Sequence, residues 1–546
     1  MNKLLKMTAM IAVAASFLAG CGDDDKKTPE PAAPTVEMVG ANIDEVHEIT
    51  STMSVKVAVT SEAGIGRFDI TIDSPMLTEE FLKGVGLAAQ MELVTASSSM
   101  AGVLKNFGFP VGNEVKDAKT LSFDISKLVP LIAELGQKTS NHNFVLKITD
   151  VKGKSVTKTL KFHLTGTSSV AYNNDADLWA NTATLTVSLA EAAQSVVLQY
   201  KKSTETEWQQ TPPLTAGEDG NYIATITPTW VAAADHASGA KQFTLDNKTG
   251  VFAGNTYDFR AVVDGNVVED TADQFTVGKG DVIIDGNMDS WSKTLAYNAA
   301  FMADPETNAE YAVYYPNASA EREKAFWANG NNSMTMELCQ PFDLADNTKA
   351  AKMKGKYMWI TFAAGNLFTG IFDFVNEELS GYARFGQKYE FTARPSALKV
   401  RYKATITNYT YISKLKEGEL TKDMIDNARI FVCITDWNER HSVMSGMGAL
   451  AEGGIDKINA FDPETQATTD EGKVLAYGSK WIDASTPNED WVELVIPILY
   501  KEAERDTKPA ADKYSLVIST ASSAYGDFLS GSENNELCLD NFEWVY

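Results

Sequence analysis

The sequence lacks the short motifs that mark several common enzyme classes. It contains no Gly-x-Ser-x-Gly elbow, no His-Glu-x-x-His motif and no phosphate-binding loop. It also lacks a Cys-x-x-Cys pair or a cysteine–histidine spacing typical of zinc. Histidine is scarce, since only five are present, and His441 alone lies near a polar cluster. These absences argue against serine-hydrolase, metalloprotease and nucleotide-hydrolysing activity.

Basic residues and long hydrophobic runs are also in short supply. The 546 residues include 48 lysines and arginines against 73 acidic residues, which gives a formal net charge of −25. Such an acidic surface repels nucleic acid and anionic lipid headgroups but tolerates neutral ligands such as glycans. Because of this charge we expect no nucleic-acid partner.

Beyond the N-terminal segment, no stretch has the length and hydrophobicity of a transmembrane helix.

The first 20 residues have the features of a secretory signal peptide. Lys3 and Lys6 precede an apolar run from Met7 to Leu18, which is too short to span a bilayer. The run ends in Leu18-Ala19-Gly20-Cys21, which resembles the lipobox of bacterial lipoproteins. That resemblance implies cleavage after residue 20 and acylation of Cys21, so that the lipid anchor holds the protein on the outer membrane. The alternative is an ordinary secretory signal.

Residues 21–34 form a tether with an acidic start. Asp23-Asp24-Asp25 follows the cysteine closely and resembles the export signal of surface lipoproteins in Bacteroidetes. This resemblance implies exposure on the cell surface, whereas the alternative is a solvated spacer. Pro29, Pro31 and Pro34 favour an extended and semi-rigid chain.

With Cys21 acylated, three cysteines remain, and an odd number cannot all pair within the chain. Cys433 and Cys538 lie in apolar strand patterns, where a thiol acts as a small hydrophobic group. We expect no disulfide framework.

Residues 35–166 predict an immunoglobulin-like domain with insertions. Apolar residues alternate with polar ones in several short runs, and the segments 144–148 and 160–164 form a predicted hairpin. The segments 77–93 and 125–135 interrupt the strands as helical or irregular insertions.

Residues 167–279 resemble a fibronectin type III or related immunoglobulin-like module. In this interpretation Trp208 fills the space between two sheets and Tyr257 lies near the tyrosine-corner position.

Residues 280–546 contain many strand signals and seven of the ten tryptophans, of which Trp359 is expected in the core. About 265 residues in one β unit fit a large jelly roll. The predicted fold class is therefore all-β, with two immunoglobulin-like β-sandwich modules followed by a larger jelly-roll β-sandwich.

An ordered series of strings in residues 282–546 resembles the carbohydrate metabolism domain (PCMD) family of Bacteroidetes surface lipoproteins. The strings include 363–370, 385–386, 391–398, 477–478, 522–528 and 539–546. The resemblance implies carbohydrate handling and a jelly-roll fold like that of carbohydrate-binding modules. It carries over no catalytic residues.

Sugar recognition combines a flat aromatic surface with planar polar groups. Three clusters have this composition, and the alternative for each tryptophan is that it closes the edge of the core. The candidate ligand-binding residues are Trp291, Trp327, Asn329, Asn331, Asp436, Trp437, Asn438 and Arg440.

The segment 285–289 has side-chain oxygens at alternate positions, a spacing that hard cations prefer. A plain Asp-Gly turn also explains this pattern. In many sugar-binding jelly rolls an aspartate of the last strand helps to hold a structural calcium. No other cofactor is expected, and the candidate calcium ligands are Asp285, Asp289 and Asp540.

The sequence thus predicts a non-catalytic surface lipoprotein that binds a polysaccharide or oligosaccharide through its C-terminal domain. Other surface glycan-utilisation proteins are candidate partners. A second hypothesis is a glycoside-active enzyme, which needs two flanking carboxylates. Asp436, Glu439, Asp462 and Glu464 are the candidates for that pair. A third hypothesis is a structural or adhesion protein of the outer membrane.

Overall fold

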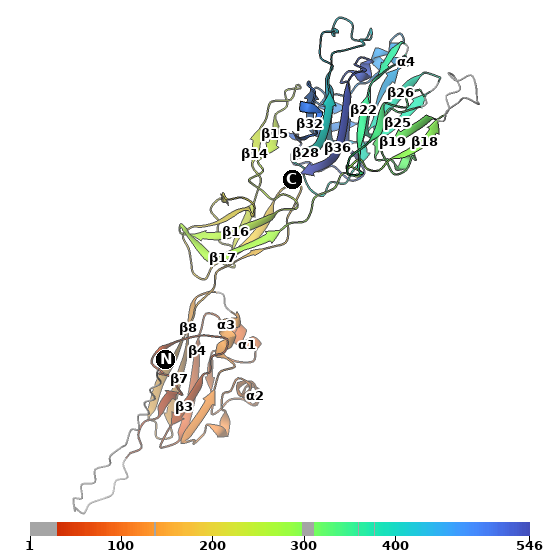
Figure 1. Cartoon of the computed structure of the whole chain (residues 1–546). Coiled ribbons are helices and arrows are strands. Elements are labelled where there is room, and N and C mark those ends of the chain that lie inside the picture. The colour runs from red at the N-terminus through yellow and green to blue at the C-terminus, as the bar shows by residue number, and fades with distance from the viewer. Residues whose placement is uncertain (1–29, 136–137, 297–310, 333, 359, 376) are drawn as a thin grey trace, which may run out of the picture. The chain divides into compact units, whose positions relative to one another are not determined.

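A computed structural model describes residues 30–546, apart from residues 136–137, 297–310, 333, 359 and 376. The predicted signal peptide, Cys21 and Trp359 lie outside the described residues. The described chain consists mainly of β-strands with four short α-helices, which confirms the predicted all-β class. It divides into two compact units, residues 1–167 and 168–546 (Figure 1). No helix in the described part is long and apolar enough to cross a membrane.

The first unit contains two sheets. The smaller sheet has the order β1 (Thr35–Met38), β3 (Lys56–Thr60), β6 (Thr120–Asp124). The larger has the order β2 (Val46–Glu48), β8 (Ser155–Leu164), β7 (Ser140–Asp150), β4 (Ile65–Asp73), β5 (Gln90–Glu92). Short helices occur between strands: α1 (Glu79–Gly84), α2 (Ser98–Asn106), η1 (Gly112–Glu114), α3 (Val129–Leu135). The predicted hairpin is confirmed, since β7 and β8 pair with Phe144 opposite Leu160.

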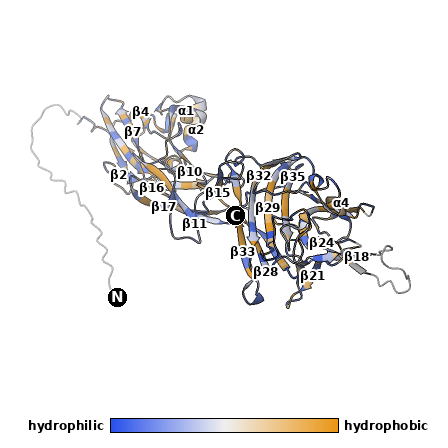
Figure 2. Ribbon diagram, turned by 90° about the horizontal axis from the view of Figure 1, so that it is seen from above, coloured by the Kyte–Doolittle hydropathy of each residue, from blue (hydrophilic) through white to orange (hydrophobic). Residues whose placement is uncertain are grey.

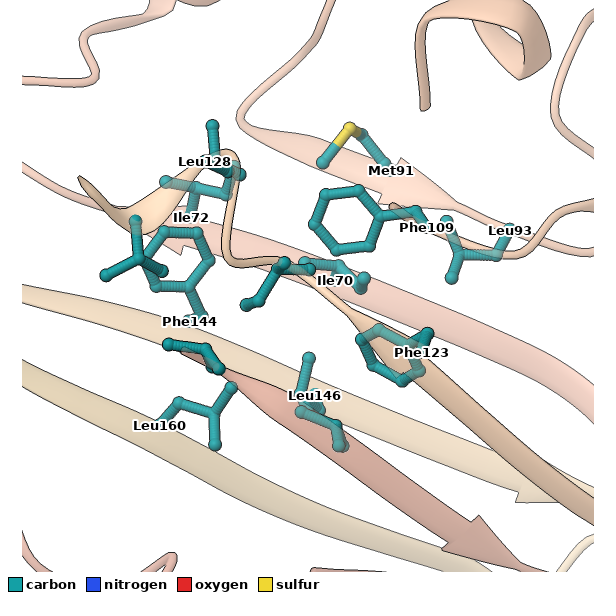
Figure 3. Close-up of a cluster of buried hydrophobic side chains, with 14 of the residues drawn as sticks. Ile70, Ile72, Met91, Leu93, Phe109, Phe123, Leu128, Phe144, Leu146 and Leu160 are labelled. Carbon is teal, nitrogen blue, oxygen red and sulfur yellow. The ribbon is translucent and has the colours of Figure 1, made fainter. Parts of the chain in front are cut away.

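The two sheets of this unit pack face to face around one apolar core. Alternate residues of each strand point inward, so that Ile70 and Leu146 of the larger sheet face Phe123 of the smaller one (Figure 3). The ring of Phe123 lies 5.8 Å from that of Phe68 in an edge contact. The insertions add to this core, because the buried Leu82 belongs to α1.

The second unit begins with a smaller sandwich. One sheet has the order β13 (Tyr222–Ile226), β10 (Ala183–Ser188), β9 (Ser169–Tyr172). The other has the order β12 (Gln209–Gln210), β11 (Val196–Lys202), β16 (Thr256–Val263), β17 (Asn266–Thr276). Tyr257 is buried between the sheets, and its hydroxyl accepts a hydrogen bond from the backbone N–H of Phe252 at 2.7 Å.

The predicted position of Trp208 is wrong. Its ring is half-buried on the outer face of the sheet, with the Arg260 guanidinium 4.1 Å from the ring centre. Lys201 also lies over the ring. Lys201 and Arg260 alternate with the inward-facing Tyr200 and Phe259, so this face is the solvent side of both strands.

A hairpin from this region joins a sheet formed by distant residues. It consists of β14 (Trp230–Ala232) and β15 (Gln242–Leu245). β15 pairs with β34 (Leu499–Lys501), which places Phe243 opposite Tyr500. The hairpin loop is also fixed, because His236 is buried and its Nε2 hydrogen-bonds to the carbonyl of Pro463 at 2.9 Å.

The rest of the second unit is a large two-sheet sandwich. Its twelve-stranded sheet follows the order β14, β15, β34, β32 (Gly472–Ile482), β29 (Ala428–Trp437), β35 (Tyr514–Ala521), β25 (Asn366–Val375), β26 (Ser380–Phe385), β30 (His441–Gly446), with β20 (Trp327–Ala328), β27 (Gln387–Lys388) and β31 (Thr468–Thr469) pairing alongside. The facing sheet has the order β21 (Cys339–Asp343), β22 (Lys349–Lys354), β36 (Glu536–Val545), β28 (Ala397–Thr405), β33 (Val492–Pro497). Two small pairs are β18 (Ser292–Ala296) with β19 (Tyr311–Tyr315) and β23 (Lys356–Met358) with β24 (Thr361–Ala363). Short helices are α4 (Met447–Leu450), η2 (Arg322–Lys324), η3 (Ile455–Lys457), η4 (Pro487–Glu489) and η5 (Gly526–Phe528).

Both faces of the twelve-stranded sheet carry apolar side chains. One face packs on the facing sheet through residues such as Leu367, Val432 and Ile518. The opposite face carries a second apolar cluster that includes Phe368 and Phe431. Figure 2 shows this hydrophobic character as orange segments on the strands around β29. A sheet that is apolar on both faces needs a cover on each, and connecting loops cover the second face.

Candidate functional site

A cavity of about 240 Å³ lies on the second face of the twelve-stranded sheet. Its floor consists of strands β25, β26, β29 and β35. The period of two along β25 explains which residues reach it: Asn366, Phe368, Phe372 and Phe374 line the cavity, whereas Leu367 points into the main core. The walls come from Met358 and from residues in the segments 330–332, 334–338, 360–364, 445–447 and 523–529.

The lining of this pocket is strongly aromatic. Its phenylalanines are Phe362, Phe368, Phe372, Phe374, Phe385, Phe431 and Phe461. Several of them contact one another edge to face, as the rings of Phe368 and Phe385 do at 5.1 Å and 88°. Phe372 and Phe374 are only half-buried, so they present accessible ring surface. Gly381 leaves room for one of them, since a Cβ at this position would lie 2.7 Å from the end of the Phe372 ring and would force the ring to shift.

Asp527 places a carboxyl group in this apolar pocket. It belongs to the 3-10 turn η5, which follows β35, and its side chain is half-buried. Burial raises the pKa of Asp527 to about 6, although the nearby Arg429 and His441 act in the opposite direction. No residue in the described part of the chain forms a hydrogen bond or ion pair with this carboxyl group. It is therefore available to a ligand.

Arg429 is the other charged residue that lines the pocket. Its Nη2 lies 2.6 Å from Asp462 Oδ1 and 3.3 Å from Glu464 Oε1, and its guanidinium lies 4.4 Å from the centre of the Trp481 ring. Glu464 also accepts a hydrogen bond from Trp481 Nε1 at 3.0 Å. Asp462 and Glu464, two of the four carboxylates named in the enzyme hypothesis, thus form an ion cluster around Arg429, and neither of them lines the pocket.

A buried acid lies directly behind the pocket wall. Ser523 lines the pocket, and its hydroxyl donates to Asp426 Oδ2 at 2.6 Å. The same oxygen accepts from the backbone N–H of Ser532 and from Asn535 Nδ2. Asp426 is fully buried, and burial raises its pKa to about 7. This network fixes the 522–535 segment, which carries Asp527.

The structure contradicts the role predicted for two of the tryptophans. Trp327 and Trp437 have no exposed surface, so neither ring can stack on a sugar. Trp327 packs against Phe542, and its Nε1 donates to the carbonyl of Ile284 at 2.8 Å. Trp437 is the last residue of β29, and its ring packs against Phe461 beneath the covering loops.

The amides and the third tryptophan of the predicted set hold loops in place. Asn329 and Asn331 are buried, and each donates to the carbonyl of Tyr314. Trp291 is half-buried, and its Nε1 donates to the carbonyl of Met288 at 2.6 Å. These three side chains therefore contribute hydrogen bonds that hold neighbouring backbone segments in place.

The last three predicted residues also contact the protein itself. Asp436 Oδ1 accepts the backbone N–H of Lys473, and Asn438 Oδ1 accepts from the Lys513 ammonium. Arg440 donates to the carbonyl of Gly386 at 3.0 Å. None of the eight predicted residues lines the pocket. A neighbouring cavity of about 220 Å³ does include Trp327, Asn329 and Asn331, and Phe372 and Phe374 line both cavities.

The predicted calcium ligands do not form a metal cluster. Asp540 pairs with Arg401 at 3.1 Å, and Asp289 accepts from the backbone N–H of Lys349 and from Asn287. Asp285 is in a left-handed turn with φ of 50°. Among the described residues, no group of three or more His, Cys, Asp or Glu side chains is arranged to hold a metal ion. Asp289 and Asp540 are thus held by partners within the protein, and the calcium site stays a prediction.

Three strings that carry the family resemblance converge on the pocket. Ala363, Ala364, Asn366 and Phe368 come from the first string, and Phe385 comes from the second. The third, 522–528, contributes Ser523, Ala524, Gly526 and Asp527. These strings were the sequence signal for the site, since Asp527 has no local pattern that marks a binding residue.

Comparison with known proteins gives one family match. The family model described as "Putative carbohydrate metabolism domain" matches residues 301–545. No curated protein was found to be similar to the chain.

Several solved structures resemble parts of the chain at low identity. A putative glycoside hydrolase from Bacteroides thetaiotaomicron is 17% identical, with 66% of this chain and 98% of that chain covered and a TM-score of 0.29. One from Bacteroides vulgatus is 18% identical, with 40% and 85% covered and a TM-score of 0.27. The protein SGBP-B of the Bacteroides ovatus mixed-linkage glucan utilization locus, solved with a heptasaccharide, is 11% identical, with 86% and 99% covered and a TM-score of 0.13.

Proposed function

We propose that the C-terminal sandwich binds a glycan in the phenylalanine-lined pocket. The observation that carries this proposal is the convergence of three family strings on one cavity. The description of the family model that matches this region refers to carbohydrate metabolism. A site that a family shares is expected where its shared strings meet in space.

The composition of the pocket supports this proposal. Sugars present flat C–H faces, which pack on accessible aromatic rings such as Phe372 and Phe374. A few polar groups then fix the orientation of the ligand. Asn366 and Asp527 are the candidates for this role, since both line the pocket and are half-buried.

We further propose that the protein is displayed on the outer membrane through a lipid on Cys21. The lipobox pattern and the acidic run after it support this localisation. In that setting the pocket would meet polysaccharides outside the cell, and other surface glycan-utilisation proteins would be natural partners.

The binding proposal is tested by titration of the full chain, produced without its signal segment, against plant, host and bacterial polysaccharides. We expect Phe372→Ala to weaken binding of the responding polysaccharide at least tenfold. Phe342→Ala is the matched control, because Phe342 is also a half-buried phenylalanine of this sandwich but lies outside the pocket. If the wild-type protein bound none of the polysaccharides in the panel, the proposal would be refuted.

A glycoside-active enzyme is the second candidate. Asp527 favours it, because a carboxyl group with a pKa raised to about 6 suits a general acid. Release of reducing sugar by the wild-type protein, abolished in Asp527→Asn, would establish this activity. Binding without release, at any pH from 5 to 8, would leave the pocket as a binding site.

A further inference from the structure

The deep part of the pocket provides little for sugar hydroxyl groups to bond with. Phe368, Phe385, Phe431 and Leu529 form it, and all four are buried. A hydroxyl group moved from water into such a site loses hydrogen bonds that the site does not replace. The group that enters this region should therefore be apolar, even if the rest of the ligand is a sugar.

Several polar side chains in the lining already bond within the protein. Asn332 donates to Gly330 and Thr335 and accepts from two backbone N–H groups. Thr520 donates to the carbonyl of Leu367, and Ser523 donates to Asp426. Arg429 is paired with Asp462. These groups shape the pocket but have little capacity left for a ligand.

Four polar side chains in the lining have no hydrogen-bond partner in the described part of the chain. They are the Asp527 carboxyl group, the Thr361 hydroxyl group, whose oxygen is buried, and the hydroxyl groups of the half-buried residues Ser445 and Ser519. A protonated carboxyl and a hydroxyl can each donate one hydrogen bond. The pocket therefore combines apolar walls with donors for a small number of acceptor oxygens.

An ester-linked acyl group has the complementary chemistry. It carries an apolar chain, a carbonyl oxygen that accepts hydrogen bonds and no donor. We propose that the pocket receives an O-acyl substituent of an esterified glycan, with the acyl chain against the phenylalanines and the ester carbonyl against Asp527. This inference rests on the proposed glycan-binding function and names the chemical group that the pocket selects.

The groups around Asp527 set the expected pH dependence of binding. The charges of Arg429 in β29 and His441 in β30 lower the pKa of Asp527, which opposes the effect of burial. Arg429 is paired with Asp462 and Glu464, and His441 is paired with Glu471. The neutral acid donates to an ester carbonyl, whereas the carboxylate repels it. Because the pKa of Asp527 is raised to about 6, binding should be tightest below pH 6 and weaken as the pH rises through 7.

The experiment is calorimetric titration of the full chain with naturally acetylated xylan, glucomannan and pectin, each before and after mild alkaline de-esterification. We expect a loss of affinity of at least tenfold on de-esterification. Asp527→Asn keeps a donor, so it should bind the acetylated form without the pH dependence, while Asp527→Ala should bind about tenfold more weakly. Glu439→Gln is the control, since Glu439 is an exposed carboxylate outside the pocket.

A second variant tests the pocket without changing any polar group. Ala383→Leu extends from the floor strand β26 into the cavity and should abolish binding of the acetylated probes while the thermal unfolding midpoint stays within a few degrees. Equal binding before and after de-esterification would overturn the acyl inference and leave glycan binding standing. No binding of any polysaccharide in either form would overturn both.

Discussion

The guanidinium of Arg394 is buried among three aromatic rings. Its carbon lies 4.9 Å from the ring centre of Trp179 and 5.1 Å from those of Trp230 and Tyr500. Its Nε donates to the carbonyl of Trp179 at 2.5 Å. Burial lowers the pKa of Arg394, and the contacts of this side chain connect the two sandwiches of residues 168–546.

We expect Arg394→Met to lower the free energy of unfolding of this unit by about 3 kcal/mol, since buried carbonyl acceptors lose their donor and the cation–π contacts disappear. Denaturant unfolding followed by tryptophan fluorescence measures this loss. Arg384→Met is the control, because Arg384 is half exposed and forms a surface ion pair with Asp373, which should be worth less than about 1 kcal/mol. Equal effects of the two substitutions would contradict the structural role of the aromatic cluster.

Asp426 should make stability depend on pH. The pKa of its carboxyl group is raised to about 7 in the folded state, above the value of about 4 expected in the unfolded chain. For an acid with a raised pKa, folding is favoured by protonation, so its contribution is greatest below pH 4 and declines as the pH rises to 7. We expect this decline to be on the order of 3 kcal/mol.

Asp426→Asn should remove this decline, because the amide oxygen can still accept from Ser532 and Asn535 without carrying a charge. The difference in unfolding free energy between the wild type and the variant, measured at pH 4, 5.5 and 7, isolates the contribution of this group. A difference that does not change with pH would show that Asp426 stays ionised throughout.

The sequence could not reveal which tryptophans are exposed. Trp327 and Trp437 stand beside polar residues, and this composition predicted exposed sugar-binding surfaces. Burial depends instead on pairing between distant strands: Trp327 lies opposite Thr369, and Trp437 lies opposite Tyr514. Asp527 was missed for the same reason, since the residues that desolvate it come from other strands.

At the scale of elements, the two faces of strand β25 have different roles. Side chains on one face pack in the main core and stabilise the fold, whereas side chains on the other face line the pocket. Leu367 is fully buried in the main core, whereas Phe372 lies on the other face and is half-buried. We expect Leu367→Ala to cost about 3 kcal/mol of unfolding free energy, and Phe372→Ala to cost about 1 kcal/mol because less of the ring is buried. Glycan affinity should respond in the opposite order.

Paired measurements of unfolding and of polysaccharide binding on these two variants test the assignment of the faces. A larger stability loss for Phe372→Ala than for Leu367→Ala would mean that the second face is the principal core. In that case the pocket would be a packing defect rather than a binding site.

Period-two patterns identified strands correctly in residues 35–166, because alternation is a local property. The segments 144–148 and 160–164 of the predicted hairpin lie in β7 and β8. The β14–β15 hairpin shows the limit of this approach. Its strands are short, and the pairing of β15 with β34 joins residues more than 250 positions apart, for which the sequence contains no local signal.

At the scale of the whole molecule, the N-terminal pattern makes two separate predictions. The first concerns anchoring, which depends on the thiol of Cys21. We expect Cys21→Ser to move the protein from the detergent phase to the aqueous phase on Triton X-114 partitioning, since the variant lacks the thiol that would carry the lipid. A variant that stays in the detergent phase would contradict lipid anchoring.

The second prediction concerns display rather than anchoring, and it depends on charge. Replacing Asp23, Asp24 and Asp25 by asparagine keeps the length of the tether and the acylated cysteine but removes the acidic run. We expect this variant to remain in the detergent phase yet to resist protease added to intact cells, whereas the wild type is cleaved. Equal cleavage of both proteins would show that the acidic run is only a spacer. Because the two variants change different readouts, anchoring and surface exposure can be judged independently of whether the pocket binds a glycan.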